Sequence, residues 1–293
     1  MRRLRPNPLG AFHPLLAESN VWHYLLRAMH SGVPRASAFI TDLAARGRNH
    51  FGTGEAADAL GVTLPAVRAA LRRLKRKGEI ADPYRGFHVI VPPEYRRLGC
   101  LPANQFIGQL MEHLGEPYYV ALLSAAELHG AAHQPPQGLQ VMVKLARRPL
   151  VCGEVHVQFV ARRDLESTAV IERRTPRGPL RVASAASTAL ELVGYADRCG
   201  GLDNVASVVA ELAETLDGHA LVAAARSSPI SWVQRLGYLL DLAERRKLAD
   251  ALVPLVAKRA RVLAPLVRSR SVAGTRRLAR WKLSLNATVE PDP

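Results

Sequence analysis

The sequence predicts an α+β fold, in which an N-terminal winged helix-turn-helix precedes a larger α+β domain with a mainly antiparallel sheet and a helical C-terminal half. Three observations support this prediction. Residues 34–91 follow the order helix, alanine-rich helix, glycine turn, basic helix and hairpin. Strand-like segments are predicted at 139–143, 155–160, 169–174 and 180–183, and from residue 185 onward apolar side chains recur at helical spacing. A chain of 293 residues is long enough for two domains.

The first half of the N-terminal module is helical. A helix over 34–46 has apolar side chains at helical spacing, and Gly47 suits its C-terminal end. A second helix begins near Thr53 and is rich in alanine, which permits close packing. Gly61 then supplies the turn, and Thr63 has the residue type of an N-cap for the next helix.

That next helix, over 64–77, is amphipathic and basic. Its predicted core stripe consists of Leu64, Val67, Leu71 and Leu74, at spacings of three, four and three residues. The opposite face carries Arg72, Arg73 and Arg76, with Arg68 and Lys75 at its edges. Such a helix can lie in the major groove of DNA with its N-terminal residues towards the base edges.

A hairpin follows the basic helix and completes the winged module. Strands at 79–81 and 87–91 flank a turn at 82–86, which forms a wing carrying Arg85. Pro92-Pro93 ends the second strand and marks a domain boundary. The expected divisions are therefore an N-terminal extension over 1–33, a winged module over 34–93 and an α+β domain over 94–293.

The charge distribution favours a polyanionic partner. The formal net charge is +15. Residues 1–93 carry 14 Lys and Arg against 6 Asp and Glu, whereas residues 94–244 carry 14 against 16. Residues 245–282 carry 12 against 1 and form a second basic region, which is either a binding surface or a solvated helical face. Its candidate residues are Arg245, Arg246, Lys247, Lys258, Arg259, Arg261, Arg268, Arg270, Arg276 and Arg277.

The winged module is the leading candidate for binding double-stranded DNA, and a module used only for protein contacts is the alternative. In the DNA interpretation, Thr63, Pro65, Ala66 and Arg68 lie nearest the bases. Arg68 is the expected partner of a guanine. The phosphate contacts would come from Arg72, Arg73, Lys75, Arg76 and Arg85.

Composition excludes several other classes of protein. Apolar residues make up 48% and charged residues 22%, which is ordinary for a globular protein. No segment has the length and apolarity of a membrane span or of a secretory signal, so a cytoplasmic protein is expected.

The three cysteines form no Cys-x-x-Cys pair and are expected to be reduced core residues.

The remaining two hundred residues contain no recognised catalytic motif, and we expect no catalytic residues, no cofactor and no metal. His129 and His133 have the i, i+4 spacing of metal ligands, but Gly130 and the prolines after His133 favour histidines at a helix end. Trp281, in a strand-like segment over 278–285, is predicted to anchor the core, with stacking on nucleic acid as the alternative.

Three segments resemble AbiEi-type antitoxins of type IV toxin-antitoxin systems. They are VALLSAAELHGAAHQ at 120–134, LVGYADRCGGLDNVA at 192–206 and WKLSLNATVEPD at 281–292. The resemblance implies a non-enzymatic protein that represses its own operon by binding inverted repeats, as a homodimer would. It also implies neutralisation of an AbiEii-like nucleotidyltransferase toxin, directly or functionally, and a role in phage defence.

Two other classes of function stay open at the level of sequence. One is a ligand-responsive winged-helix transcription factor. The other is a nucleic-acid enzyme whose C-terminal catalytic domain has no recognised motif.

Overall fold

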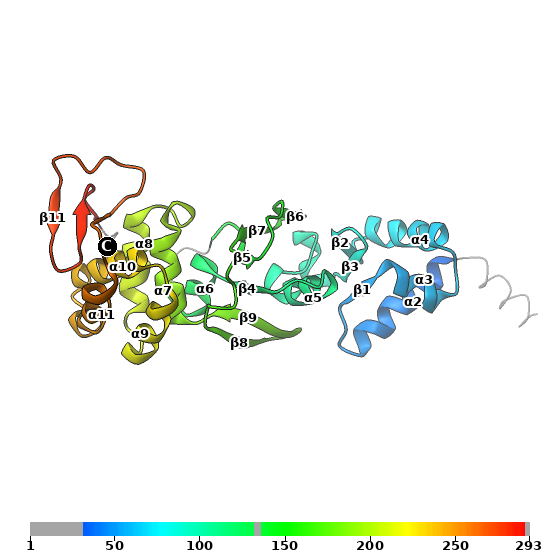
Figure 1. Cartoon of the computed structure of the whole chain (residues 1–293). Coiled ribbons are helices and arrows are strands. Elements are labelled where there is room, and N and C mark those ends of the chain that lie inside the picture. The colour runs from blue at the N-terminus through cyan, green and yellow to red at the C-terminus, as the bar shows by residue number, and fades with distance from the viewer. Residues whose placement is uncertain (1–31, 132–135, 291–293) are drawn as a thin grey trace, which may run out of the picture.

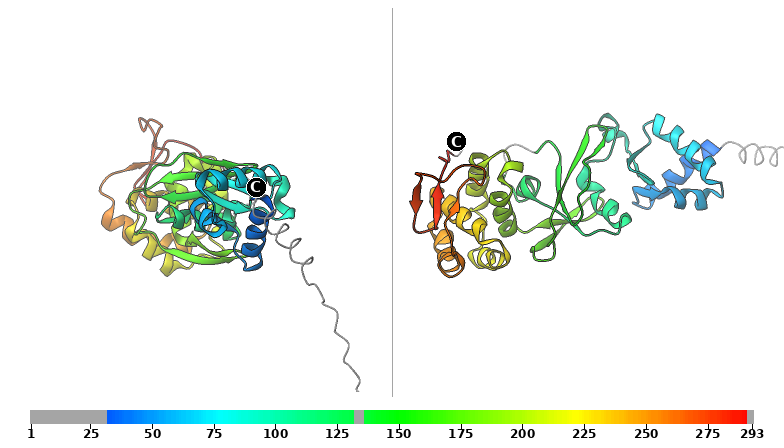
Figure 2. Two further views of the ribbon diagram at one scale, coloured as in Figure 1. Left: turned by 90° about the vertical axis from the view of Figure 1, so that its right-hand side faces the viewer. Right: turned by 45° about the horizontal axis from the view of Figure 1, so that its top comes forward.

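The computed structural model describes residues 32–131 and 136–290, and it confirms the predicted α+β class. The winged module, the central sheet and the C-terminal helices follow one another along an elongated molecule (Figure 1). Two further views agree with this arrangement (Figure 2). Most of the predicted N-terminal extension, and His133 of the predicted histidine pair, lie outside the described residues.

The N-terminal module contains the predicted helices and hairpin together with one additional strand. Its elements are α2 (Gly32–Ala45), β1 (His50–Gly52), α3 (Thr53–Leu60), α4 (Leu64–Arg76), β2 (Ile80–Tyr84) and β3 (Phe87–Ile90). The three strands pair antiparallel in the order β1-β3-β2. Strand β1 was not predicted, because a segment of three residues is too short to show alternation.

Both faces of this small sheet are buried. Ile80 and Ile90 belong to the hydrophobic core formed with α2, α3 and α4. Phe87 and Val89 belong to the core of the rest of the molecule. Successive residues of a strand point to opposite faces, so β3 alternates between the two cores. The hairpin therefore joins the winged module to the central sheet.

The central part is a six-stranded sheet in the order β6-β7-β5-β4-β9-β8, in which three of the five pairings are antiparallel. The predicted strands at 139–143, 155–160, 169–174 and 180–183 correspond to β5, β7, β8 and β9. Strands β4 and β6 were not predicted, and both are three residues long. The elements are η1 (Pro93–Leu98), η2 (Ala103–Gln105), α5 (Ile107–His113), β4 (Tyr118–Val120), α6 (Leu122–Leu128), β5 (Leu139–Val143), β6 (Leu150–Cys152), β7 (Val155–Ala161), β8 (Val170–Thr175) and β9 (Gly178–Ala183).

The C-terminal part is built around α7, whose residues 186–193 are all buried. Its elements are α7 (Ala185–Gly194), η3 (Ala196–Arg198), α8 (Leu202–Leu212), α9 (Gly218–Ser227), α10 (Ile230–Leu242), α11 (Arg246–Arg259), β10 (Ala264–Pro265), β11 (Arg276–Leu278) and β12 (Leu283–Leu285). The predicted strand over 278–285 is therefore two strands. Because Lys282 has a left-handed φ of 47°, the chain turns between β11 and β12.

Trp281 lies in this turn and is fully buried, as predicted for a core anchor. Its Nε1 donates a hydrogen bond to Asp241 Oδ2 at 2.6 Å, and its ring packs directly on Gly237 of α10. Cys100 and Cys199 are also fully buried thiols, whereas Cys152 is partly exposed. Within the described residues, none of the helices combines the length and apolarity that crossing a bilayer requires.

Candidate DNA-binding surface

Helix α4 presents its first turn to solvent. Gly61, in the left-handed conformation (φ 63°), ends α3, and Thr63 occupies the N-cap position of α4 in an extended conformation. The Thr63 side chain makes no capping hydrogen bond, while its carbonyl accepts one from the Val67 amide at 2.9 Å. Thr63, Pro65 and Ala66 are all exposed. These three side chains are therefore accessible to a ligand.

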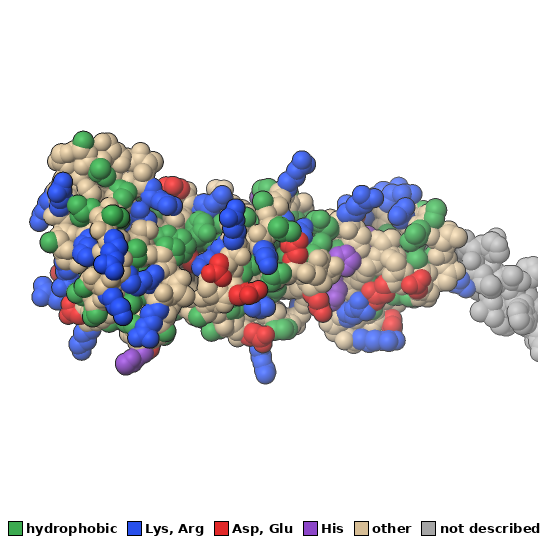
Figure 3. All heavy atoms as spheres, viewed as in Figure 1, with side chains coloured by type: hydrophobic (Ala, Val, Ile, Leu, Met, Phe, Trp, Pro, Cys, Tyr) green, Lys and Arg blue, Asp and Glu red, His purple; other side chains and the backbone are tan. Residues whose placement is uncertain are grey.

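The exposed face of α4 carries a basic stripe of Arg68, Arg72 and Arg76, with Pro65 at its N-terminal end. These residues are spaced by three, four and four positions, so they lie above one another on one side of the helix. All four are exposed. In the space-filling view, Lys and Arg side chains gather over α4 (Figure 3). Arg73 lies beside the stripe and is half-buried, and its Nε has no hydrogen-bond partner. The opposite side of α4 is buried through Val67, Ala70, Leu71 and Leu74.

Leu64 differs from the prediction, which placed it in the core stripe. Its exposed fraction is 47%, whereas that of Val67 is 0%. Leu64 lies at the first position of α4, before the helix reaches the core of α2 and α3. Its helical spacing to Val67 therefore does not bury it. An exposed apolar side chain at this end of the helix can contact the methyl group of a thymine.

Lys75 is engaged with the hairpin. Its Nζ donates to Asp82 Oδ2 at 2.9 Å, and Asp82 Oδ1 lies 2.7 Å from His88 Nδ1. His88 Nε2 lies 2.8 Å from Thr53 Oγ1. Burial opposes ionisation of Asp82, but His88 and Lys75 outweigh it and lower the pKa of that carboxyl. The hydrogen bond to Asp82 raises the pKa of Lys75. This chain of contacts fixes β2 against α4.

The tip of the wing lies beside the central part of the molecule. Arg85 is exposed, and the neighbouring Tyr84 hydroxyl accepts a hydrogen bond from Arg147 at 3.5 Å. The Arg147 guanidinium lies 6.0 Å from the centre of the Tyr84 ring and forms an ion pair with Glu116. Arg148 is exposed and lines the same groove as Tyr84. The sequence analysis did not select Arg148. Its adjacent pair with Arg147 is a basic signal in the sequence, but its position beside the wing depends on the fold.

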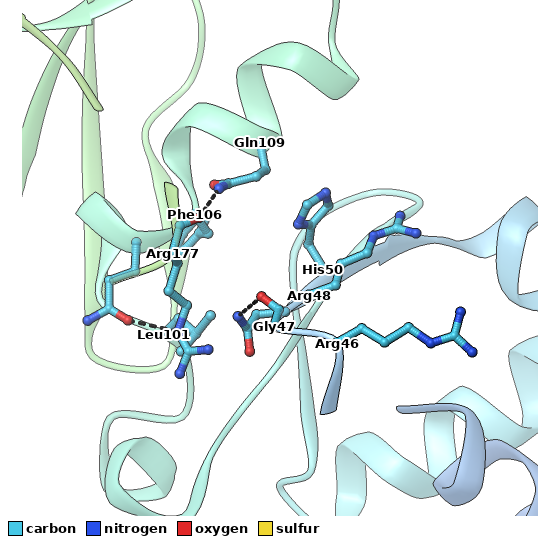
Figure 4. Close-up of a pocket in the computed structure, with 10 residues that line it drawn as sticks. Arg46, Gly47, Arg48, His50, Leu101, Phe106, Gln109 and Arg177 are labelled. Carbon is cyan, nitrogen blue, oxygen red and sulfur yellow. Dashed lines mark hydrogen bonds between the residues drawn. The ribbon is translucent and has the colours of Figure 1, made fainter. Parts of the chain in front are cut away.

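A small cavity lies where the winged module meets the central part (Figure 4). Its volume is ≈ 160 Å³, and Arg48, Asn49, Phe106 and Arg177 are among its lining residues. Arg48 pairs with Glu55, and Arg177 Nε donates to Gln105 Oε1 at 3.1 Å. Small-molecule sites usually enclose about 300–1,000 Å³. This cavity is therefore smaller than an ordinary effector site.

Of the predicted pair His129 and His133, only His129 lies within the described residues, and its side chain lies against a backbone carbonyl. His129 Nε2 lies 2.8 Å from the carbonyl oxygen of Ala183, and burial lowers the pKa of His129. Across residues 32–131 and 136–290, no group of three or more His, Cys, Asp and Glu side chains has the arrangement of a metal site.

Comparison with known families gives a match over one part of the chain. Residues 119–242, from β4 to the end of α10, match the family model of the AbiEi antitoxin C-terminal domain. The chain therefore contains an AbiEi antitoxin domain. This assignment agrees with the resemblance found in the sequence, supports an antitoxin role and implies a toxin partner.

Comparison with solved structures supports the fold over most of the chain. The crystal structure of the RV2827C protein from Mycobacterium tuberculosis is similar with a TM-score of 0.61 and 16% sequence identity. The match covers 85% of this chain and 90% of that chain, and therefore includes parts outside the AbiEi antitoxin domain. A search of curated proteins gives no match.

The second basic region begins after the matched antitoxin residues. Some of its candidate side chains have partners within the fold, and the others are exposed. Arg245 and Arg259 have structural partners. Arg245 pairs with Glu214 at 2.9 Å, and Arg259 donates to the carbonyl oxygens of Ala225, Arg226 and Ser228, each at 2.9 Å. The exposed members are Arg246, Lys247, Lys258, Arg261, Arg268, Arg270, Arg276 and Arg277.

Proposed function

We propose that the protein is a non-enzymatic antitoxin that also binds operator DNA through α4 and represses its own operon. The observation that carries this proposal is the exposed stripe of Arg68, Arg72 and Arg76 on a helix whose opposite side is fully buried. The AbiEi antitoxin domain supports the antitoxin part of the proposal. The proposed division is an extension over 1–33, a DNA-binding module over 34–93 and an antitoxin domain over 94–293, in a cytoplasmic protein.

The proposed roles of the α4 residues follow from their positions. Thr63, Leu64, Pro65 and Ala66 are exposed in the first turn and would face the base edges. Arg68, one turn further along, would pair with guanine, which arginine contacts through two parallel hydrogen bonds. Arg72, Arg73, Arg76 and Arg85 would contact phosphates, while Lys75 would serve chiefly to hold the hairpin through Asp82.

Repression by binding inverted repeats requires two copies of the module. We propose a homodimer on DNA, with the two α4 helices about 34 Å apart or a multiple of that distance, so that each enters a major groove on the same side of the duplex. The antitoxin domain would neutralise a nucleotidyltransferase toxin of the AbiEii-like type. This pairing would serve phage defence.

Binding to the DNA upstream of its own gene tests the DNA-binding proposal. Fluorescence anisotropy of the full chain would compare this DNA with a scrambled duplex at two salt concentrations. We expect a strong preference for the upstream DNA, and a loss of affinity in the Arg72→Ala/Arg76→Ala variant. Equal and steeply salt-dependent binding to both duplexes would contradict operator recognition and leave a general affinity for polyanions.

Neutralisation is tested separately, with the same full-length variant expressed from an independent promoter beside the cognate toxin. We expect Arg72→Ala/Arg76→Ala to rescue growth as well as the unmodified chain does, because repression of the operon plays no part in this assay. Failure of both proteins to rescue would contradict toxin neutralisation. Rescue by the unmodified chain alone would show that neutralisation uses the surface of α4.

A further inference from the structure

A cavity in the C-terminal part of the molecule lies away from the proposed DNA-binding surface. It has a volume of ≈ 310 Å³ and opens between α10, the N-terminal end of α8 and the turn that follows β10. Its lining includes three arginines, Arg235, Arg268 and Arg270. In Figure 1 these elements lie at the opposite end of the molecule from α4.

Arg235 is a buried cation whose hydrogen bonds go to a backbone carbonyl. Its exposed fraction is 3%, and its Nε and Nη2 both donate to one acceptor, the carbonyl oxygen of Pro265, at 3.2 and 3.0 Å. Among the described residues no carboxylate forms an ion pair with it. Burial lowers the pKa of Arg235 and the nearby Arg268 acts in the same direction, while the Asp197 carboxylate acts in the opposite direction. A buried charge is costly unless it is paired, so this site favours an anion.

Arg268 and Arg270 reach the cavity from a turn with a fixed backbone. Asn286 Nδ2 donates to the carbonyl oxygens of Val267 and Arg270, each at 2.9 Å, and Asn286 Oδ1 accepts from the Val267 amide at 2.9 Å. Within the described part of the chain, the side chains of Arg268 and Arg270 form neither ion pairs nor hydrogen bonds. Both guanidinium groups are therefore available to a ligand.

The remaining polar groups of the cavity do not cancel its positive character. Asp197 and Asp203 also line it, but Asp203 Oδ1 accepts a hydrogen bond from the Glu290 amide at 3.0 Å. Three arginines thus line the cavity with two aspartates, one of which accepts a backbone hydrogen bond. Ser269 and Thr288 contribute hydroxyl groups that can donate to an oxyanion.

We propose that this cavity binds the phosphate group of a small molecule through Arg235, Arg268 and Arg270. Guanidinium groups match the oxygen geometry of phosphate and form paired, charge-assisted hydrogen bonds with it. The volume lies at the lower end of the range for small-molecule sites, about 300 Å³, which suits free phosphate or a mononucleotide. This site does not depend on the proposed operator binding, since α4 has no residue in it.

Calorimetric titration and thermal unfolding of the full chain test the site, with inorganic phosphate and ATP as separate probes and NaCl keeping the ionic strength constant. We expect at least one probe to bind and to raise the unfolding temperature with increasing concentration. Stronger binding of ATP would identify a nucleotide, and equal or stronger binding of phosphate would identify the free ion. Absence of both effects for both probes would overturn the proposal.

Variants separate this cavity from general attraction to a basic surface. Arg268→Ala/Arg270→Ala alters two exposed side chains on a turn held by backbone contacts of Asn286, and we expect it to weaken binding of the probe about ten-fold or more. Arg276→Ala/Arg277→Ala removes the same charge from β11, whose side chains do not line the cavity, and should leave the affinity unchanged. Equal affinities of these two variants would overturn the proposal.

Discussion

At the scale of single residues, the proposed DNA binding gives the side chains of α4 two roles, base contacts near its N-terminal end and phosphate contacts further along. Arg68 is exposed one turn from the N-terminal end of the helix, whereas Arg76 is exposed at its C-terminal end. The N-terminal residues of a recognition helix approach the base edges, and its later residues approach the backbone. Alanine substitutions at these two positions should therefore have different effects on the affinity for operator and for scrambled DNA.

We expect Arg68→Ala to lose about 1–3 kcal/mol of binding free energy on the operator and much less on scrambled DNA, because a bidentate contact to guanine is specific. Arg76→Ala should weaken binding to both duplexes and reduce the slope of affinity against salt concentration by about one. Anisotropy titrations over a salt series measure both quantities. An equal loss on both duplexes for Arg68→Ala would contradict its role in base recognition.

Glu191 is a second position where one side chain controls a measurable property, namely the pH dependence of the unfolding free energy. It is 1% exposed, and its Oε1 lies 2.6 Å from both Tyr119 Oη and Arg162 Nη1. Burial outweighs these hydrogen bonds and raises the pKa of Glu191 to about 7. The folded protein therefore holds a proton that the unfolded chain releases near pH 4.3.

The unfolding free energy should consequently fall as the pH rises from about 4.3 to about 7, by an amount on the order of 3 kcal/mol, and then level off. Denaturant unfolding of the unmodified chain and of Glu191→Gln across this range measures the difference, which should change with pH because glutamine does not titrate. Glu166→Gln, at an exposed position, is the control and should leave the pH dependence unchanged. A constant difference between the chain and Glu191→Gln would contradict the raised pKa.

At the scale of elements, the C-terminal helices rely on a close contact between a glycine and a tryptophan. A Cβ atom added at Gly237 of α10 would collide with the Trp281 ring. Trp281 has little room to move, since it is fully buried and hydrogen-bonded to Asp241. The contact joins α10 to the turn between β11 and β12.

We expect Gly237→Ala to lower the unfolding free energy by about 1–3 kcal/mol, because overpacking forces the ring or the helix to shift. Gly54→Ala is the matched control. Gly54 also lies in a helix, but an added Cβ there meets no atom within 4 Å. Alanine at that position should be neutral or stabilising by up to about 1 kcal/mol. Similar behaviour of the two variants in thermal unfolding would contradict the importance of the contact.

At the scale of the whole molecule, the two basic regions are well separated. The stripe on α4 and the arginines of β11 lie at opposite ends of the elongated chain (Figures 1 and 3). A short straight duplex bound by α4 would not reach β11. The second basic region is therefore expected to serve a contact other than the operator.

We expect Arg276→Ala/Arg277→Ala to leave operator affinity unchanged within error, whereas Arg72→Ala/Arg76→Ala should reduce it ten-fold or more, since two phosphate contacts are lost. Anisotropy with a duplex limited to the operator measures both variants under the same conditions. If the β11 variant lost as much affinity as the α4 variant, DNA would have to wrap along the molecule. If the β11 variant instead keeps its operator affinity, a growth-rescue assay with the toxin shows whether these arginines serve neutralisation.

The sequence by itself determined the order of the helices and the hairpin in the winged module and the amphipathic character of α4, because helical periodicity is a local property of neighbouring residues. The alternating segment around Trp281 indicated a core anchor, and three segments of the sequence resemble AbiEi antitoxins. Strands β1, β4 and β6 escaped prediction, since three residues carry no periodic signal and acquire their structure from distant partners.

Tertiary structure decided which side chains are free and which converge. Leu64 is exposed because the core begins one turn later, and Lys75 is engaged because the fold brings Asp82 to it. The cavity of Arg235, Arg268 and Arg270 unites residues of α10 with a turn some thirty positions further along the chain. Such contacts depend on how elements pack, and the spacing of residues along a single element does not encode them.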